Sequence, residues 1–180
     1  EAGCTFYGPE IDIKITDAIG GKWQCGTIQV GFNLPERFGV EYVAEDNTRK
    51  QPVMIHRAIL GSFERFIGIL TEHYAGEFPF FLAPTQVIFV PISESHADHA
   101  HALKKRLLLE GMDAEVYDKN DSLNKRVRNA EKQRVPYVVI IGDEEITNKT
   151  VAIRDRRAKA QYNLTQDEFM VKLTQQLQEG

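Results

Sequence analysis

The sequence has 180 residues, of which 42% are hydrophobic and 27% are charged, and its formal net charge is −4. These values are typical of a soluble globular protein and exclude a disordered tail, and the length allows one large domain or two small ones. No apolar run approaches the roughly 18 residues that span a bilayer, which excludes an integral membrane protein.

The cysteines and the first residues add two expectations. Cys4 and Cys25 are too few for a disulfide framework and form no C-x-x-C pair, which predicts a reducing, cytoplasmic location. The chain begins at Glu1 without an initiator Met and without a secretory leader. We therefore expect it to be a segment of a longer protein.

The first part of the chain predicts an antiparallel hairpin. Residues 11–17 and 23–30 alternate apolar and polar side chains, as in strands with one solvated face. Gly20 and Gly21 suit the turn between them. The polar stretch that follows, residues 35–50, is expected to form a loop.

A helix is predicted over residues 57–74, where apolar side chains recur at helical spacing. Gly61 and Gly68 interrupt this stripe. A glycine inside a helix costs about 1 kcal/mol relative to alanine, so we expect another group to approach the backbone closely at these positions.

The second half predicts an alternating α/β domain, connected to the first half through residues 75–84. Strands are predicted at 87–92, 113–117, 137–142 and 151–154. Helices are predicted at 97–110, at 121–133 after the N-cap residues Asp121 and Ser122, and at 165–177 after a capping-box pattern. The resulting order is β-α-β-α-β-β-α, compact enough for one domain.

The net charge conceals two basic islands in the second half. Residues 119–134 carry six Lys or Arg against two acidic residues, and residues 149–159 carry five against one, so each island has a local charge of +4. Clustered cations are typical of a nucleic-acid footprint because they displace counterions from phosphates. A solvated helix face and a charged strand end explain the same pattern.

Two further polar clusters are not predicted to bind a metal ion or another cation. His96, His99 and His101 resemble a metal site in composition, but no Cys or carboxylate cluster completes the ligand set, and we expect them at the start of an exposed helix. The acidic run at residues 143–145 is expected to form a turn and not a cation site.

The segment Gly61-Ser62-Phe63-Glu64-Arg65 combines small residues with an arginine. Small residues allow a ligand to lie against the backbone, and a planar guanidinium can stack on a base or hold a phosphate. So short a pattern also fits an ordinary helix with an exposed arginine.

Longer motifs, in register along the whole chain, resemble one enzyme family. They are Phe6-Tyr7-Gly8-Pro9, Trp23-Gln24-Cys25-Gly26-Thr27-Ile28-Gln29, Met54-Ile55-His56-Arg57-Ala58-Ile59-Leu60-Gly61-Ser62, Glu64-Arg65-Phe66, Leu82-Ala83-Pro84, Arg134-Val135-Pro136-Tyr137 and Gly142-Asp143. The sequence resembles the C-terminal part of bacterial-type threonyl-tRNA synthetases. The resemblance implies an α/β fold, with the end of an antiparallel-sheet class II catalytic domain, including motif 3, at residues 1–82 and a mixed-sheet β-α-β-α-β-β-α anticodon-binding domain at residues 83–180.

The activity that the resemblance implies is ATP-dependent activation of threonine and its transfer to threonine tRNA. It implies ATP with Mg²⁺, a Zn²⁺ ion, a homodimer in the full-length protein, and neither DNA nor a membrane as a partner. Motif 1, motif 2 and two zinc ligands of the family are not in this sequence, so we expect the chain alone to be inactive.

The resemblance also implies roles for individual residues. The catalytic candidates are Arg65, Gln29 and Tyr7. The candidates that line the adenylate are Gln24, Thr27, Ser62 and Arg65, with Cys25 as a small wall residue. His56 is implied as one of three zinc ligands, in a site that holds both the amino group and the hydroxyl of threonine and so rejects valine. The implied anticodon-reading residues are Asn120, Arg128, Arg134, Glu145 and Arg154.

The match departs from the family at two positions beside the implied active site. Glu10 stands where the family more often has Lys, and Gly31 stands where Asp is usual. An alternative is therefore a noncatalytic tRNA-binding module that retains the synthetase fold. A reading frame that continues upstream through motif 2 would favour the ligase, and a start codon just before Glu1 would favour the module. A small nucleotide-binding α/β protein is weaker, because no G-x-G-x-x-G or P-loop is present.

Overall fold

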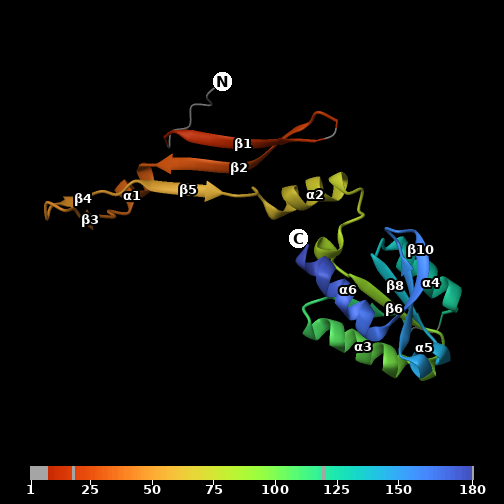
Figure 1. The fold of residues 1–180 in the computed structure, drawn as a ribbon. Helices are drawn as coiled ribbons and strands as arrows, with labels where there is room; N and C mark the ends of the chain where they lie inside the picture. The colour runs from red at the N-terminus through yellow and green to blue at the C-terminus, as the bar shows by residue number, and fades with distance from the viewer. Residues whose placement is uncertain (1–7, 18, 119–120, 180) are drawn as a thin grey trace. The chain divides into compact units, whose positions relative to one another are not determined.

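The computed structural model describes residues 8–17, 19–118 and 121–179. The chain divides into two units, Glu1–His73 and Tyr74–Gly180 (Figure 1). Within the described ranges, no helix combines the length and the apolar character needed to cross a membrane.

The first unit is built on a three-stranded antiparallel sheet in the order β1-β2-β5. Its strands are β1 (Glu10–Thr16), β2 (Lys22–Gly31) and β5 (Met54–Ala58). The expected hairpin of β1 and β2 is confirmed. Asp17 holds the turn, because its carboxylate accepts a hydrogen bond from the backbone N–H of Gly21 at 2.7 Å, and Gly20 adopts the left-handed conformation at φ +87°.

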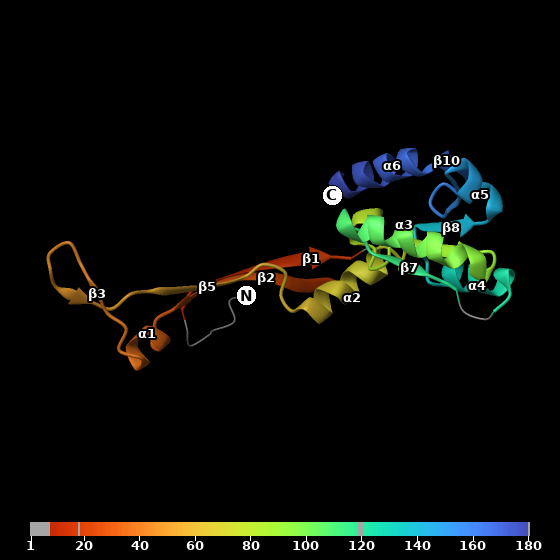
Figure 2. The ribbon, with the colours of Figure 1, turned by 90° about the horizontal axis from the view of Figure 1, so that it is seen from below.

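The polar stretch after β2 is not the plain loop that the sequence predicts. It contains three short elements, α1 (Asn33–Arg37), β3 (Tyr42–Val43) and β4 (Arg49–Lys50). The β3–β4 hairpin extends beyond the end of the three-stranded sheet (Figure 2). Its turn is held by Asp46, whose pKa is lowered to about 2 by hydrogen bonds from the Thr48 hydroxyl and Lys50.

The helix after β5 begins later than predicted. It is α2 (Phe63–His73), and the predicted first turn instead belongs to β5 and to the turn that follows it. Gly61 has φ +75°, which interrupts a helix, and a Cβ at this position would lie 3.0 Å from the carbonyl oxygen of Cys25. The close approach expected at Gly61 is thus confirmed, whereas Gly68 has open space around it.

The second unit contains a five-stranded mixed sheet in the order β10-β9-β8-β6-β7. Its strands are β6 (Val87–Pro91), β7 (Ala114–Val116), β8 (Tyr137–Ile141), β9 (Thr150–Asp155) and β10 (Ala160–Thr165). β6 pairs in parallel with β7 and β8, and β9 runs antiparallel to β8 and β10. The expected α/β fold with a mixed sheet is confirmed.

Helices and short 3₁₀ turns connect these strands. They are η1 (Phe80–Leu82), η2 (Glu94–His96), α3 (Ala97–Leu109), α4 (Leu123–Lys132), α5 (Asp143–Asn148) and α6 (Gln166–Gln178). The predicted N-caps Ser122 and Thr165 are confirmed by hydrogen bonds from the third residue of each helix. The predicted turn at Asp143 is wrong, since α5 begins there, and β10 was not predicted. The observed order is β-α-β-α-β-α-β-β-α.

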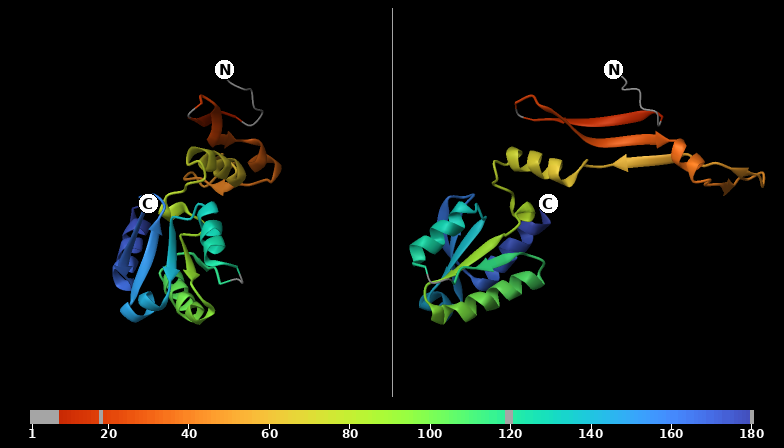
Figure 3. Two further views of the ribbon diagram at one scale, coloured as in Figure 1. Left: turned by 90° about the vertical axis from the view of Figure 1, so that its right-hand side faces the viewer. Right: turned by 180° about the vertical axis from the view of Figure 1, so that it is seen from behind.

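The sheet of the second unit has two differently covered faces. α3 and α6 pack on one face with Phe89, Val139 and Leu173, and Phe80 of the predicted connection joins this cluster. On the other face α4 packs against β6 and β8 around Val138. Figure 3 shows α6 and α4 on opposite sides of the sheet. Next to α4, the face formed by β8, β9 and β10 holds an open groove.

Candidate functional site

One face of the first unit's sheet gathers the residues implied for substrate binding. Gln29 pairs with Glu10 of β1 on one side and with His56 of β5 on the other, and Thr27 pairs in the same way with Asp12. Directly paired residues of antiparallel strands point to the same face of a sheet, and alternate residues share it. Gln29, Thr27 and His56 therefore lie on one face, together with two carboxylates.

Hydrogen bonds orient the polar side chains on this face. The side-chain Nε2 of Gln29 donates to Glu10 Oε2 at 2.7 Å, and the Thr27 hydroxyl donates to Asp12 Oδ1 at 3.0 Å. Gln24 Nε2 donates to Asp12 Oδ1 as well, and to Thr27 Oγ1 at 3.1 Å. The sequence reasoning did not single out Asp12, although its position two residues after Glu10 in an alternating strand places it on the same face.

The turn at Gly61 brings Ser62 and Arg65 to the same end of the sheet as Gln24. Ser62 Oγ accepts a hydrogen bond from the backbone N–H of Arg65 at 3.2 Å, at the start of α2. Arg65 Nη1 donates to the backbone oxygen of Gln24 at 3.1 Å. One guanidinium donor thus holds Arg65 at the strand, and its other donors are available to an anionic ligand. The third catalytic candidate, Tyr7, lies outside the described residues.

His56 is an exposed residue of β5 beside Gly31. A Cβ at Gly31 would lie 3.3 Å from His56 Nε2, so the glycine leaves this imidazole nitrogen uncrowded. Zinc sites use four ligands, or three and a water. Among the residues that the structure describes, no group of three or more His, Cys, Asp or Glu could hold a metal ion. His56 alone does not form a zinc site.

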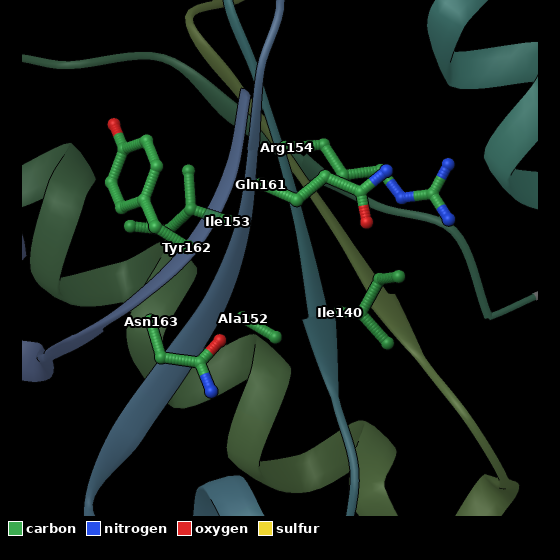
Figure 4. Close-up of a pocket in the computed structure, with 7 residues that line it drawn as sticks. All are labelled: Ile140, Ala152, Ile153, Arg154, Gln161, Tyr162 and Asn163. Carbon is green, nitrogen blue, oxygen red and sulfur yellow. The ribbon is translucent and has the colours of Figure 1, made fainter. Parts of the chain in front are cut away.

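A second candidate site is the open groove on the sheet of the second unit, which has a volume of about 370 Å³. Figure 4 shows the residues that line it, Ile140 of β8, Ala152, Ile153 and Arg154 of β9, and Gln161, Tyr162 and Asn163 of β10. Because side chains alternate along a strand, Ile153 and Tyr162 turn toward the packed face, and Tyr162 contacts the core there. Gln161 pairs with Arg154, and Asn163 pairs with Ala152.

Arg154 is held in place by α4. Its Nη1 donates to Glu131 Oε1 at 3.0 Å, and its Nε is buried and has no hydrogen-bond partner among the described residues. Arg128 lies one helical turn before Glu131, so it is on the same side of α4, and it is exposed. Of the five implied anticodon residues, the structure therefore places Arg154 in the lining of the groove and Arg128 on the side of α4 that carries Glu131, the partner of Arg154.

The other three implied anticodon residues are placed differently. Arg134 lies between α4 and β8 with φ +59°, and its guanidinium donates to the backbone oxygen of Ala75. Glu145 accepts from the backbone N–H of Gly142 at 2.8 Å and so caps α5. Asn120 lies outside the described residues. Arg134 and Glu145 thus already have local structural partners.

The first basic island contains one residue with a purely internal role. Arg126 belongs neither to a nucleic-acid footprint nor to a solvated helix face, the two explanations of this island, because its side chain is buried and donates to four backbone oxygens. These belong to Pro91, Ile92, Tyr117 and Asp121. Arg126 ties the ends of β6 and β7 to α4, so part of the basic pattern reports on folding and not on binding.

The three histidines each have a different partner. His96 is buried, contrary to the exposed position expected, with Nε2 3.0 Å from Asp143 and Nδ1 3.0 Å from Ser93 Oγ. His101 lies 3.0 Å from Asp118, and His99 lies 3.0 Å from Gln166. Each histidine thus joins the helix region to another segment.

Two family models match this chain. Residues 86–176 match the family model of the anticodon binding domain. Residues 2–74 match the tRNA synthetase class II core domain (G, H, P, S and T). The chain therefore belongs to the anticodon binding domain family.

The curated relatives are more specific. The chain is 82% identical over its whole length to a threonine–tRNA ligase of Sulfurovum sp. (strain NBC37-1) and 64% identical over 99% of its length to that of Campylobacter lari (strain RM2100 / D67 / ATCC BAA-1060). It spans about 30% of the length of each of these proteins. The resemblance inferred from the motifs is confirmed.

Solved structures agree with this assignment. The RNA binding domain of threonyl-tRNA synthetase from Cryptosporidium parvum Iowa II has a TM-score of 0.82 and 37% identity, over 97% of this chain and 44% of that one. The putative threonyl-tRNA synthetase ThrRS-1 from Aeropyrum pernix has a TM-score of 0.62 and 29% identity, over 97% of this chain and 43% of that one.

Proposed function

We propose that this chain is the C-terminal portion of a threonine–tRNA ligase. In this proposal residues 1–82 form the end of the catalytic domain, and residues 83–180 form the domain that binds the anticodon of threonine tRNA. The observation that carries the proposal is the open groove on β8, β9 and β10 with Arg154 held at its side, in a domain of the anticodon-binding family. The similarity to threonine–tRNA ligases along the whole chain supports it.

The groove is suited to single-stranded RNA. Proteins read unpaired bases by stacking them on flat side chains and by hydrogen-bonding their edges. Arg154 and Arg128 supply planar cations beside an apolar floor. In the proposed complex Arg134, Glu145 and Asn120 complete the anticodon contacts, and the partners that Arg134 and Glu145 have in this structure hold their side chains in defined positions.

The polar face of the first unit is suited to the two substrates of amino-acid activation. In the proposed reaction the threonine carboxylate attacks the α-phosphate of ATP and pyrophosphate leaves, which gives the adenylate. A ribose hydroxyl at the 3′ end of the tRNA then attacks the acyl carbon of the adenylate, and AMP leaves. Arg65 holds the nucleotide through its remaining donors, while Gln24, Thr27 and Ser62 line the adenylate. Such fixed donors accelerate phosphate chemistry mainly by position and charge.

Gln29 has a defined orientation on this face. Its Nε2 is engaged by Glu10, so its Oε1 is the atom that remains to accept a hydrogen bond from the ammonium or hydroxyl group of threonine. Tyr7 is proposed as a further catalytic residue. His56 would supply one ligand of a Zn²⁺ ion, whose other ligands would come from outside the described residues, and Mg²⁺ would neutralise phosphate charge when ATP is bound. The carboxylates of Glu10 and Asp12 are engaged by amide and hydroxyl donors.

A noncatalytic tRNA-binding module remains the second candidate, and Glu10 favours it. Its carboxylate lies on the same face as the residues proposed to hold ATP and threonine. A negative charge in that position repels the triphosphate and the threonine carboxylate. The same charge has no effect on a function confined to the anticodon-binding domain.

Filter binding of threonine tRNA to the 180-residue chain tests the anticodon assignment. We expect Arg154→Ala to weaken binding about tenfold or more, and binding to fall steeply with salt. Arg106→Ala is the matched control, because Arg106 lies on α3, which packs on the opposite face, and pairs there with Asp167. Equal losses in the two variants, or no loss in either, would contradict the assignment.

A chimera separates the ligase from the module. In the chimera, this chain is substituted for the corresponding residues of the Sulfurovum threonine–tRNA ligase. The measurement is the threonine-dependent exchange of pyrophosphate into ATP. We expect activity, and a loss of at least about tenfold in Arg65→Ala, because one charged contact to a transition state is worth several kcal/mol. A folded chimera that binds tRNA but does not catalyse exchange would favour the noncatalytic module.

A further inference from the structure

Two side-chain amides line the groove and are exposed to solvent. Gln161 and Asn163 are exposed residues of β10, and neither amide forms a hydrogen bond with any of the described residues. They stand two positions apart, so both belong to the face of β10 that carries the groove.

The groove beside these amides is open to solvent and combines an aliphatic floor with polar side chains. Its volume is about 370 Å³. Its floor is aliphatic, from Ile140 and Ala152, and the Arg154 side chain lies across from Gln161 (Figure 4). A flat aromatic ring can pack on the aliphatic floor with one face and stack on the guanidinium with the other.

The strand that carries the amides is rigidly held from behind. Tyr162, between them, turns to the packed face, where its hydroxyl donates to Asp155 at 2.9 Å. Asp155 in turn accepts from the backbone N–H of Ala158 at 2.9 Å and from Lys172 of α6 at 3.3 Å. Polar groups on such a fixed strand keep their spacing when a ligand binds, which favours recognition of a defined edge.

We propose that Gln161 and Asn163 read the edge of one unpaired RNA base, seated in the groove between the floor of Ile140 and Ala152 and the guanidinium of Arg154. This proposal rests on the proposed binding of tRNA. Each amide presents a donor next to an acceptor, which matches the edge of one base and leaves unpaired polar groups against another. A neutral amide adds no net charge, so in this proposal the two residues supply discrimination, and Arg154 and Arg128 supply the electrostatic attraction.

The nature of the groove favours RNA over an apolar or acidic peptide. Arg154 of β9 is a cation at the groove, and Glu131 of α4 engages one of its donors. Two neutral amides beside an aliphatic floor suit the polar edge and the apolar faces of a base, whereas an apolar peptide would leave both amides unpaired.

The test uses anticodon stem-loop RNAs of threonine tRNA, the original and a set in which each anticodon base is changed in turn. Binding to the 180-residue chain is measured by fluorescence anisotropy. The variants are Gln161→Met and Asn163→Leu, singly and together, which keep side-chain size but remove the amide. Gln175→Met is the matched control, an exposed glutamine on α6, the helix that packs on the opposite face.

We expect wild-type chain to prefer the original base at one anticodon position by about tenfold or more, and the double variant to lose most of that preference. The slope of log Kd against log salt stays unchanged, because no phosphate contact is removed. Gln175→Met keeps both the preference and the slope.

Two other outcomes overturn the inference and differ in what they leave standing. If the double variant keeps the full preference while Arg154→Ala weakens binding, Gln161 and Asn163 do not read a base, and the anticodon assignment stands. If the wild-type chain binds all stem-loops no better than an unrelated RNA hairpin, the proposed function fails together with the inference.

Discussion

The two units of this chain place their apolar side chains in opposite ways. In the second unit every residue of β6 is buried, and the sheet separates two apolar clusters. In the first unit every residue of β1 is exposed, and α2 buries none of its residues. The exposed apolar side chains of β1 and α2 are typical of a face that packs against another protein surface. The groove of the second unit therefore lies on a sheet with a packed back, while the polar face of the first unit is arranged by local hydrogen bonds and turns.

This difference has a consequence for how each site is maintained. Arg154, Gln161 and Asn163 stand on strands whose neighbours are anchored in a core. Gln24, Gln29 and Thr27 are oriented by the carboxylates of β1, at the surface of a three-stranded sheet. Substitutions in the two units should therefore differ in their effects on stability.

The largest expected effect on the free energy of unfolding comes from creating a cavity in the core of the second unit. Leu173 of α6 is completely buried, and Leu173→Ala should lower the free energy of unfolding by about 2–5 kcal/mol. Ile13→Ala, on β1, removes a side chain that is 54% exposed and should change it by less than about 0.5 kcal/mol.

Urea unfolding separates these two effects. Circular dichroism follows the whole chain, and the single tryptophan, Trp23, reports on the first unit only. An Ile13→Ala effect as large as that of Leu173→Ala would mean that the first unit has a packed core of its own.

The next effect concerns the polar cluster behind the groove. Asp155 is buried and accepts hydrogen bonds from Ala158, Tyr162 and Lys172. Burial by itself raises the pKa of the Asp155 carboxyl, but the backbone N–H of Ala158, the Tyr162 hydroxyl and the Lys172 ammonium outweigh it, so the net pKa is lowered. Asp155→Asn should lower the free energy of unfolding by about 1–3 kcal/mol at neutral pH.

The lowered pKa also predicts how this contribution depends on pH. It is fully present above the unfolded-state pKa of about 3.9 and is lost as the pH falls through the lower pKa of the folded state. Unfolding free energies measured from pH 7 to pH 2 should therefore converge for wild type and Asp155→Asn at the acid end. A gap that stays constant at every pH would show that the carboxylate charge is not the cause.

A smaller effect on stability is expected at the glycine turn that positions Arg65. Gly61→Ala should destabilise the first unit by about 1–2 kcal/mol, because alanine at φ +75° is strained and its Cβ crowds the Cys25 carbonyl. Gly68→Ala, inside α2 with open space around it, should stabilise the helix by about 0.5–1 kcal/mol. Trp23 fluorescence during urea unfolding measures both, and two changes of the same sign would contradict the assigned backbone roles.

The smallest expected effect is the loss of the ion pair that holds Arg154. Both partners are partly exposed, so Glu131→Gln should lower the free energy of unfolding by only about 0.2–1 kcal/mol. Glu144→Gln, an exposed residue of α5, serves as the control. A loss above about 2 kcal/mol in Glu131→Gln would indicate that this pair is part of the fold and not only a means of orienting Arg154.

Local patterns predicted much of the second unit. β6 and β8 follow from almost continuous apolar runs, and the starts of α4 and α6 follow from Ser122 and Thr165, because burial on both faces and helix capping depend on adjacent residues. β10 was missed because its residues alternate weakly and pair only with a strand that the fold supplies.

In the first unit the miss at α2 has a different cause. The apolar stripe continues backwards through Leu60, so periodicity alone extends the helix too far. The positive φ of Gly61 ends that pattern, and the reason for it is the Cys25 carbonyl, which belongs to another strand. Arg126 was also misjudged because its contacts come from distant segments. The four backbone oxygens that accept hydrogen bonds from its guanidinium belong to two separate loop regions and to the end of β6.

By itself the sequence determined the family, the mixed α/β fold and the residue types available for chemistry, because motifs, periodicity and caps are local properties of the chain. Only the tertiary structure decided which of these residues meet. It set Gln29 between Glu10 and His56, buried Arg126, and left Gln161 and Asn163 beside Arg154 in an open groove. The physical reason is that strand register and helix packing bring together side chains that are distant in sequence, and they decide which polar groups are already paired and which remain for a ligand.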